Sequence, residues 1–163
     1  MHMDNIQILG FTASIDSVEG TLNEINSFKE DGEIIQIMNA DSVVCKNQII
    51  HGVNQAFLAF ERGENLANDI SVEIVLRCSA QRQISKAFDM LGLKEGHMNL
   101  CVVLINSKDY FQEFSSLFDF DESVFVANFD NLVDVYNVSD VELETMSLEE
   151  IIIDRITKLT VDY

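Results

Sequence analysis

Residues 99–105 constrain the fold of this chain more than any other segment, because the run Asn-Leu-Cys-Val-Val-Leu-Ile is almost wholly apolar. A run of this length and composition is typical of a β-strand that is covered on both faces. We therefore predict that residues 99–105 form a strand in the centre of a β-sheet.

Shorter strands and amphipathic helices alternate along the rest of the chain. Alternating and β-branched patterns predict strands at residues 6–10, 33–38 and 123–127. Apolar residues at helical spacing predict helices at residues 17–30, 47–62, 68–78, 81–91, 129–138 and 151–159, and a further one after Ser107. These patterns predict an α/β (mixed α+β) fold in which a small β-sheet is packed with several α-helices. No proline, Ser/Gly-rich linker or repeat divides the chain, so we expect residues 1–163 to form a single compact domain.

Three of the helices carry explicit sequence signals. Ser147 and Glu150 match a capping box ahead of the last helix. Ser107 is expected to cap a helix whose apolar stripe comprises Tyr110, Phe111, Phe114, Leu117 and Phe118. In the helix at 81–91, the buried stripe is expected to comprise Ile84, Ala87, Phe88 and Leu91.

Simple counts exclude several classes of protein. The longest uncharged apolar runs fall far short of the roughly 20 residues that a membrane helix needs, so we expect no membrane partner. The opening Met-His-Met-Asp is not the start of a signal peptide. Cys45, Cys78 and Cys101 fit neither a disulfide framework nor a zinc ligand set. We expect a soluble, cytoplasmic protein with reduced and mostly buried cysteines.

The net charge of −18 is segregated along the chain. Residues 45–97 contain 6 Lys and Arg and 6 Asp and Glu, whereas the remainder contains 4 Lys and Arg and 22 Asp and Glu. The acidic remainder indicates either a solvated surface that favours solubility or a specific binding role. Binding to phosphates requires Lys and Arg, so nucleic acid is compatible only with the neutral middle of the chain.

No catalytic, cofactor or metal motif is present. The seven glycines form neither a dinucleotide-binding nor a phosphate-binding loop, and the sequence lacks the GxSxG pattern of a hydrolase nucleophile. The three histidines lie too far apart for HExxH. A calcium loop starting at Asp119 would place Val124 at the position that requires Gly and Asp130 at the position that requires Glu. We therefore expect a protein that is not an enzyme and holds no cofactor or metal.

Residues 79–84 form the most unusual segment, because they separate two helices and open the second one. Helix starts bind anions through free backbone N–H groups. Arg82 and Lys86, four residues apart, repel each other unless an anion or an acidic group lies between them. Asp89 is the alternative partner for Lys86, so a solvated helix face and an anion site both remain open.

An ordered set of residues resembles a known family. The set comprises residues 36–41 (Gln-Ile-Met-Asn-Ala-Asp), His51, 54–56 (Asn-Gln-Ala), Asn68, 73–77 (Glu-Ile-Val-Leu-Arg), Ser79, 82–84 (Arg-Gln-Ile), Ala87 and Gly92. It resembles the small regulatory subunit of the KEOPS (EKC) complex, in its archaeal type, which is called the PRPK-binding protein in eukaryotes. The match covers roughly residues 36–105. The family usually has Gly where Ala80 stands, and Ala is strained there if the backbone needs a positive φ.

The resemblance implies a noncatalytic subunit of the complex that installs threonylcarbamoyl on the adenosine beside the tRNA anticodon. Its implied partners are the small atypical kinase/ATPase subunit of KEOPS, which it binds and regulates, the 3′ CCA tail of tRNA and, indirectly, the other subunits. A single-stranded tail of a few nucleotides needs only a few cations and stacking surfaces. The neutral middle of the chain satisfies that requirement.

Seven residues are candidates for contact with tRNA. Arg82 and Lys86 are expected at phosphates, with Arg77 and Lys46 at the rim, and Gln81 and Gln83 are expected to bond to a base edge or a backbone oxygen. His51 is expected to stack on a base. Two alternatives stay open: Arg77 pairs only with Glu73, and His51 is a structural residue near the core.

The last helix contains a candidate for contact with the kinase. At about 100° per residue, Ile153 projects away from the apolar stripe of that helix, among acidic residues that include Glu149 and Glu150. An exposed isoleucine ringed by acids is a candidate anchor in a protein interface. The alternative is a single tolerated exposed apolar residue, or one that is covered by another part of the chain.

Two other functions are compatible with the sequence. One is an acidic protein–protein adaptor that does not bind RNA. The other is a small-molecule enzyme that holds an anionic substrate at Arg82 and Lys86.

Overall fold

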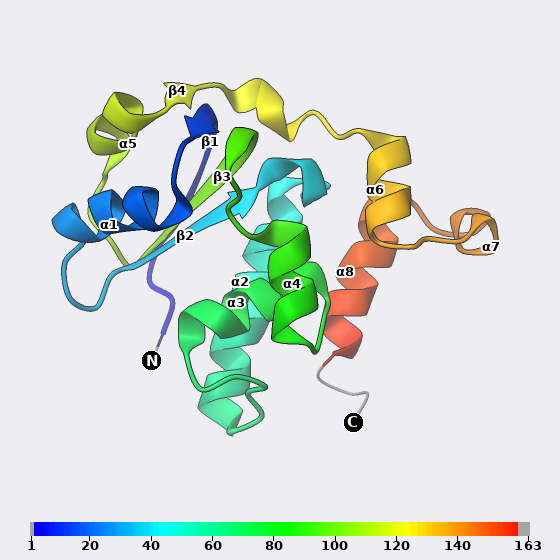
Figure 1. Ribbon diagram of the computed structural model, residues 1–163. Coiled ribbons are helices and arrows are strands. Elements are labelled where there is room, and N and C mark those ends of the chain that lie inside the picture. Colours follow the sequence, from blue (N-terminus) through cyan, green and yellow to red (C-terminus); the bar gives the residue numbers. More distant parts are fainter. Residues whose placement is uncertain (1, 160–163) are drawn as a thin grey trace.

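The computed structural model describes residues 2–159 (Figure 1). Its strands are β1 (Ile6–Ile15), β2 (Ile34–Asn39), β3 (Gly96–Ile105) and β4 (Asp119–Phe120). Its α-helices are α1 (Val18–Phe28), α2 (Lys46–Arg62), α3 (Ile70–Ser79), α4 (Ile84–Leu91), α5 (Phe111–Leu117), α6 (Phe129–Val135), α7 (Asp140–Leu143) and α8 (Leu148–Lys158). Two short 3₁₀ helices, η1 (Ala40–Ser42) and η2 (Glu122–Phe125), complete the described elements.

The strands form an antiparallel sheet in the order β2-β3-β1-β4. Strand β3 pairs with β1 from Gly96 to Ile105 and with β2 from Leu100 to Ile105. The prediction that residues 99–105 form a central strand is therefore confirmed, and the strand begins three residues earlier. The predicted fold class, a small sheet packed with several helices, is confirmed as well.

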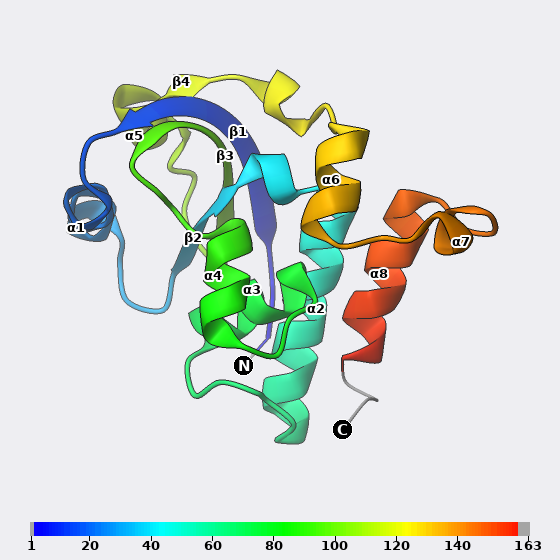
Figure 2. The same cartoon turned by 45° about the vertical axis from the view of Figure 1, so that its right-hand side comes forward.

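Each face of the sheet is covered by a separate group of helices (Figures 1 and 2). Alternate residues of β3 point to opposite faces, as the period of a strand requires. Cys101, Val103 and Ile105 pack in one cluster with residues of α2, α3 and α4, whereas Leu100 and Leu104 pack in another with residues of α1 and α5. Burying a side chain of this size stabilises the fold by roughly 1.5–3 kcal/mol. The two-sided burial of β3 therefore holds both helical layers on the sheet.

Helices α6 and α8 form a third apolar cluster on the outer side of α2 (Figure 2). Gln48 of α2 joins this cluster to the rest of the molecule. Its buried amide group donates hydrogen bonds to the carbonyl oxygen of Cys78 at 2.9 Å and to the hydroxyl of Tyr136 at 2.7 Å. The Tyr136 hydroxyl in turn donates to the carbonyl oxygen of Ser42 at 2.6 Å. The end of α3, the start of α2 and helix α6 are thus fixed relative to one another.

A fully buried ion pair organises the connection between α2 and α3. The guanidinium of Arg77 donates from Nε to Oε2 of Glu73 at 2.7 Å, and both side chains are 0% exposed. The other Glu73 oxygen accepts from the backbone N–H groups of Leu66 and Ala67 at 2.8 and 2.7 Å. Removing one partner of such a pair leaves an uncompensated buried charge, which is costly.

Several local predictions are wrong. Residues 123–127 form no strand, because the Asp121 carboxylate accepts from the Ser123 N–H and the turn closes into η2. Ser107 does not cap α5: that helix begins at Phe111, whose N–H donates to the carboxylate of Asp109. Helix α4 begins at Ile84, three residues later than predicted.

The capping box of Ser147 and Glu150 is confirmed. A second one, formed by Ser139 and Glu142 at the start of α7, was not predicted.

We predict that Arg77→Met lowers the free energy of unfolding by about 3–5 kcal/mol, because the Glu73 carboxylate stays buried without its partner. The matched control is Lys158→Met, which removes an exposed pair with Asp154 at the same helical spacing and should change stability by no more than about 0.5 kcal/mol. Urea unfolding followed by circular dichroism measures both. Equal effects of the two substitutions would contradict the prediction.

Candidate functional site

Residues 79–84, the candidate anion-binding segment, form the turn between α3 and α4, which projects away from the core. Helix α3 ends at Ala80, which adopts a left-handed conformation with φ of 55°. The N–H groups of Ala80 and Gln81 donate back to carbonyl oxygens of the last turn of α3, so this terminus is closed. Arg82 and Gln83 are exposed beyond it, and Gln81 is half-buried. The positive φ confirms that Ala80 occupies a position that favours glycine.

Arg82 connects this turn to the last helix. Its Nη2 donates to the carbonyl oxygen of Leu159 at 2.7 Å. That carbonyl belongs to the C-terminal cap of α8, where a cation is favoured by the helix dipole. Ala80, Gln81, Arg82, Gln83, Lys86 and Leu159 line a shallow concavity here, which we call the Arg82 concavity.

Lys86 also borders a second hollow, which adjoins the first along the same side of α4. This polar cleft has a volume of about 380 Å³ and is lined by Asn39, Asp41, Ser42, Lys86, Asp89, Met90, Lys94, Asn131 and Val135. Asn131 donates from its side-chain amide to the carbonyl oxygen of Asp41 at 3.1 Å, which holds α6 against η1. The cleft thus combines two lysines and two aspartates with amide and hydroxyl groups. The lysines can contact phosphate oxygens, and the amides can form hydrogen bonds with the polar edges of a ligand.

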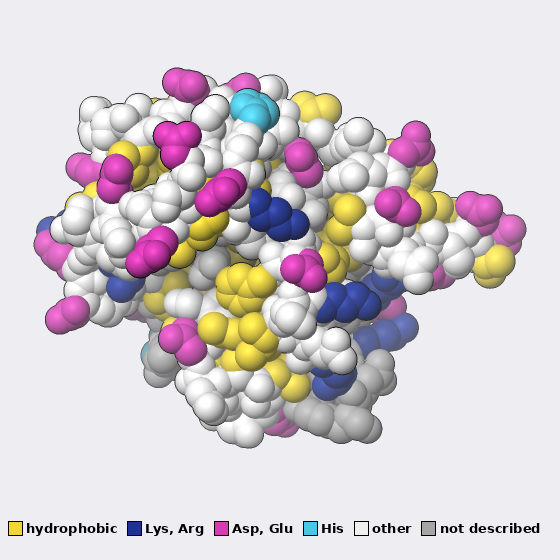
Figure 3. Space-filling view, in the orientation of Figure 1, with side chains coloured by type: hydrophobic (Ala, Val, Ile, Leu, Met, Phe, Trp, Pro, Cys, Tyr) yellow, Lys and Arg dark blue, Asp and Glu magenta, His cyan; other side chains and the backbone are white. Residues whose placement is uncertain are grey.

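Cationic side chains gather at these two hollows. Figure 3 shows Lys and Arg over α4 and α8 with an acidic side chain among them, and further Asp and Glu over the rest of the same face. Lys86 lines both hollows, so the Arg82 concavity and the polar cleft adjoin at one cation. A phosphate chain that follows α4 would therefore meet Arg82, Lys86 and then Lys94.

The opposite side of α4 is apolar. Ile84 is 51% exposed, whereas it was predicted to be buried. One turn further along α4, Phe88 lines a groove of about 350 Å³ between α1, α4 and strand β2. This α1–α4 groove is lined by Val18, Leu22, Asn26, Lys29, Ile35, Gln36, Ile37, Ser71, Phe88, Gly92 and Leu93. Figure 3 shows hydrophobic side chains exposed along the side of α4 that faces α1.

Strand β2 borders this groove and is an edge strand. Within residues 2–159 it pairs only with β3. Its outer backbone groups therefore have no strand partner there.

Three predicted tRNA contacts lie apart from this site. Lys46 pairs with Glu122 at 2.6 Å and lies 5.0 Å from the ring centre of Phe125. His51 bonds through Nε2 to the Thr157 hydroxyl at 2.7 Å, and partial burial lowers the pKa of its imidazole. Burial therefore favours the neutral imidazole, and the bond to Thr157 is a contact between α2 and α8.

The placement of Arg77 at an RNA-binding rim is wrong. Its side chain is fully buried in the ion pair with Glu73, so it cannot reach a phosphate while the chain is folded. Helical spacing indicated the pairing with Glu73, and it could not indicate how deeply the pair is buried.

The predicted kinase-contact residues lie on α8. Leu148, Ile151, Ile152, Ile156 and Leu159 are buried, which confirms the predicted stripe. Ile153 is half-buried, and Glu149 and Glu150 are exposed. Glu150 closes the capping box with Ser147, so its carboxylate already has a structural role.

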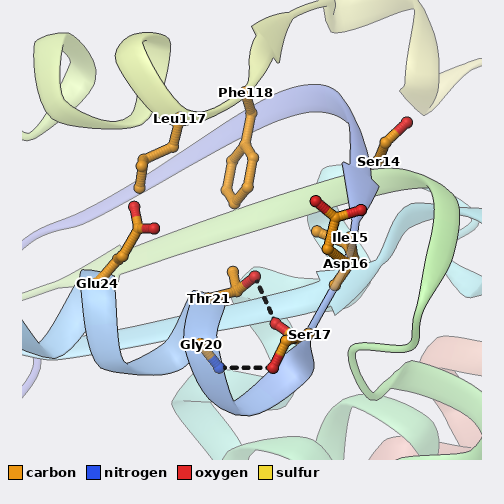
Figure 4. Close-up of a pocket in the computed structure, with 9 residues that line it drawn as sticks. All are labelled: Ser14, Ile15, Asp16, Ser17, Gly20, Thr21, Glu24, Leu117 and Phe118. Atoms are coloured by element: carbon orange, nitrogen blue, oxygen red, sulfur yellow. Dashed lines mark hydrogen bonds between the residues drawn. The ribbon is translucent and has the colours of Figure 1, made fainter.

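A third hollow, at the start of α1, is acidic. Figure 4 shows it between α1 and the end of α5, where Leu117 and Phe118 extend from α5 toward Glu24 and Asp16 at the α1 side. Ser17 caps α1 by accepting from the N–H of Gly20 at 3.0 Å. The lining contains no Lys or Arg, so this hollow is unsuited to phosphate.

Two further features are absent from residues 2–159. No helix there combines the length and apolar character needed to cross a membrane. In that same part of the chain, no group of three or more His, Cys, Asp and Glu side chains is placed to hold a metal ion.

Comparison with known proteins assigns the family. The model of a family described as "Kinase binding protein CGI-121" matches residues 15–158. The chain belongs to the CGI-121 family. This confirms the family predicted from the sequence, and all of α1 to α8 lies within the match.

A curated relative supports the same assignment. The "Regulatory protein Cgi121" of Methanocaldococcus jannaschii is 34% identical over 97 residues. The alignment covers 58% of this chain and 62% of that protein, so the chain matches less than two thirds of the relative's length.

Some residues of the candidate site were not predicted from the sequence. Asn39 belongs to the segment that carries the family resemblance, yet no chemical role was predicted for it. Lys94 and Asn131 are brought to the same cleft by α4 and α6. Residues so far apart in the chain give no local signal of a shared site.

We predict that Ala80→Gly raises the free energy of unfolding by roughly 0.5–1 kcal/mol, because glycine adopts a positive φ without strain. Gly63→Ala is the matched reverse change at the end of α2, where φ is 69° and a new Cβ would meet no atom within 4 Å. It should lower stability by a similar amount. Thermal unfolding measures both, and a loss of stability in Ala80→Gly would refute the strain argument.

Proposed function

We propose that this protein is the noncatalytic, kinase-binding regulatory subunit of a KEOPS-type complex, and that it docks the 3′ CCA tail of tRNA beside α4. The observation that carries the proposal is the division of α4 into two unlike sides. Phe88 lines the α1–α4 groove, and Ile84, one turn earlier on α4, presents exposed apolar surface. Lys86 presents a cation at the two polar hollows on the other side.

The apolar side supplies the surface for the kinase. A kinase-binding family needs an exposed apolar anchor, and Ile84 is a large exposed side chain beside an apolar groove. The free edge of β2 borders the same groove and offers backbone groups to a partner strand. Ile153 on α8 is the competing anchor, although it is more buried than Ile84.

The polar side supplies the surface for the RNA tail. Arg82, Lys86 and Lys94 are few in number, which suits a short single strand rather than a duplex. The amide groups of the polar cleft can bond to the edges of an unpaired base. Arg82 already donates to Leu159, so a phosphate would share or displace that contact.

We predict that Ile84→Glu lowers the affinity for the kinase-like ATPase of the same organism at least about tenfold, because a charge replaces a central apolar contact. Ile153→Glu is measured in parallel to test the alternative anchor on α8. Val141→Glu is the control, since Val141 is 72% exposed on α7. Isothermal titration calorimetry measures affinity, and circular dichroism confirms folding. Weakened binding in Ile153→Glu alone would move the kinase surface to α8.

We predict that Lys86→Glu lowers the affinity for intact tRNA on the order of tenfold, because a phosphate contact becomes repulsive. Lys86 is substituted in preference to Arg82, because a change at Arg82 would also remove its hydrogen bond to the carbonyl oxygen of Leu159. Arg62→Glu, an exposed reversal at the far end of α2, is the charge-matched control. Fluorescence anisotropy over a salt series should give a slope that corresponds to about two to four phosphates.

Removing the CCA end from tRNA should abolish the same binding. Equal affinity for intact and trimmed tRNA would refute docking of the tail and favour an adaptor that does not bind RNA.

A further inference from the structure

The C-terminal part of the chain is strongly acidic. Residues 109–154 contain 13 Asp and Glu and no Lys or Arg. The surface that runs along β4, η2 and α6 belongs to this stretch and lies at the top of the molecule in Figures 1 and 2. The sheet order places β4 at the edge opposite to β2, so this surface is separate from the α1–α4 groove.

This acidic edge also exposes large apolar side chains. Phe120 is 48% exposed, Val126 is 79% exposed and Phe129 is 53% exposed, all within ten consecutive residues. Asp119 and Asp130 flank them and are exposed, and neither forms an ion pair among the described residues. Apolar surface rimmed by polar residues is a feature of protein interaction sites.

The exposed residues stand on a fixed framework. The ring of Phe120 lies 5.6 Å from that of Phe11 and 5.0 Å from that of Phe111, measured between centroids. The Glu122 carboxylate accepts from the N–H of Gly10 at 2.7 Å, which ties η2 to β1. A Cβ at Gly10 would lie 2.7 Å from the carbonyl oxygen of Asp121, so glycine permits this close approach. Little conformational entropy would be lost when a partner binds such a surface.

The backbone of this edge also accommodates a partner. Strand β4 pairs with β1 through Phe11 with Phe120 and Thr12 with Asp119. On its outer side, residues 2–159 supply no further strand. An extended segment can therefore lie along β4 and place alternate side chains on Phe120.

We propose that the β4–α6 edge, defined by Asp119, Phe120, Val126, Phe129 and Asp130, docks an extended segment of another protein in which Lys or Arg alternates with apolar residues. The negative charge of this edge favours a basic partner segment. A second copy of the chain or an RNA would bring like charge to the acidic residues. A basic segment instead pairs with Asp119 and Asp130 while its apolar side chains cover the phenylalanines.

The test uses the full chain, isotope-labelled for NMR, and the synthetic peptide acetyl-KVKFKVK-amide. We expect saturable shift changes confined to residues 119–134 and neighbouring positions of β1. Phe120→Ser with Phe129→Ser should weaken binding by about fivefold or more, because apolar contact is lost. Val141→Ser, at an exposed apolar residue of α7 outside the edge, is the matched control and should bind as the wild type does.

Comparison peptides separate specific docking from charge alone. The peptide with Glu in place of Lys should not bind, and the peptide with Ser in place of Val and Phe should bind at least about fivefold more weakly. Equal binding of the Ser peptide, or shift changes spread over the other acidic surfaces, would overturn the proposal. Self-association in sedimentation that is lost in the double Ser variant would also overturn it, by assigning the edge to a second copy.

Discussion

Burial of β3 on both faces is the constraint on which the rest of this structure depends. Leu100, Val102 and Leu104 face one helical layer, and Cys101, Val103 and Ile105 face the other. A strand in this position must be covered twice, which requires the chain to supply helices on both sides of the sheet. Helix α4 is held in the second layer by Ala87 and Leu91, both fully buried. The α4 residues of the candidate site are thus attached to the core through the inner face of a single short helix.

Buried polar contacts position the turn that precedes α4. The Glu73–Arg77 pair lies within α3, and Gln48 bonds to the carbonyl oxygen of Cys78 at the end of the same helix. Such groups stabilise one arrangement because any other would leave a polar atom buried without a partner. They fix the end of α3 and hence the direction in which Ala80 turns the chain. The exposure of Arg82 and Gln83 follows from that direction.

Charge segregation and the two sides of α4 together provide separate surfaces for the proposed partners. Cations gather at the polar hollows (Figure 3), whereas the flanks of the sequence carry most of the acidic residues. Acidic flanks repel phosphates from other surfaces. They therefore favour contact between RNA and the cations Arg82, Lys86 and Lys94 beside α4. The same acidic surface is suited to basic proteins at the β4–α6 edge. The proposed RNA contact therefore lies on a cationic surface, and the proposed contact with a basic protein lies on a separate acidic surface.

The sequence alone determined the central strand, most helices, the C-terminal capping box and the family, because these depend on local periodicity and on ordered residue types. It also located Ala80 at a position suited to glycine. Only the tertiary structure determined that Ile84 is exposed, that Arg77 is buried and that Asn39, Lys94 and Asn131 share a cleft. Periodicity identifies the face of a helix, but how much of that face is covered depends on neighbours far away in the chain. The physical reason is that burial is a property of packed elements, whereas a sequence pattern reports each element by itself.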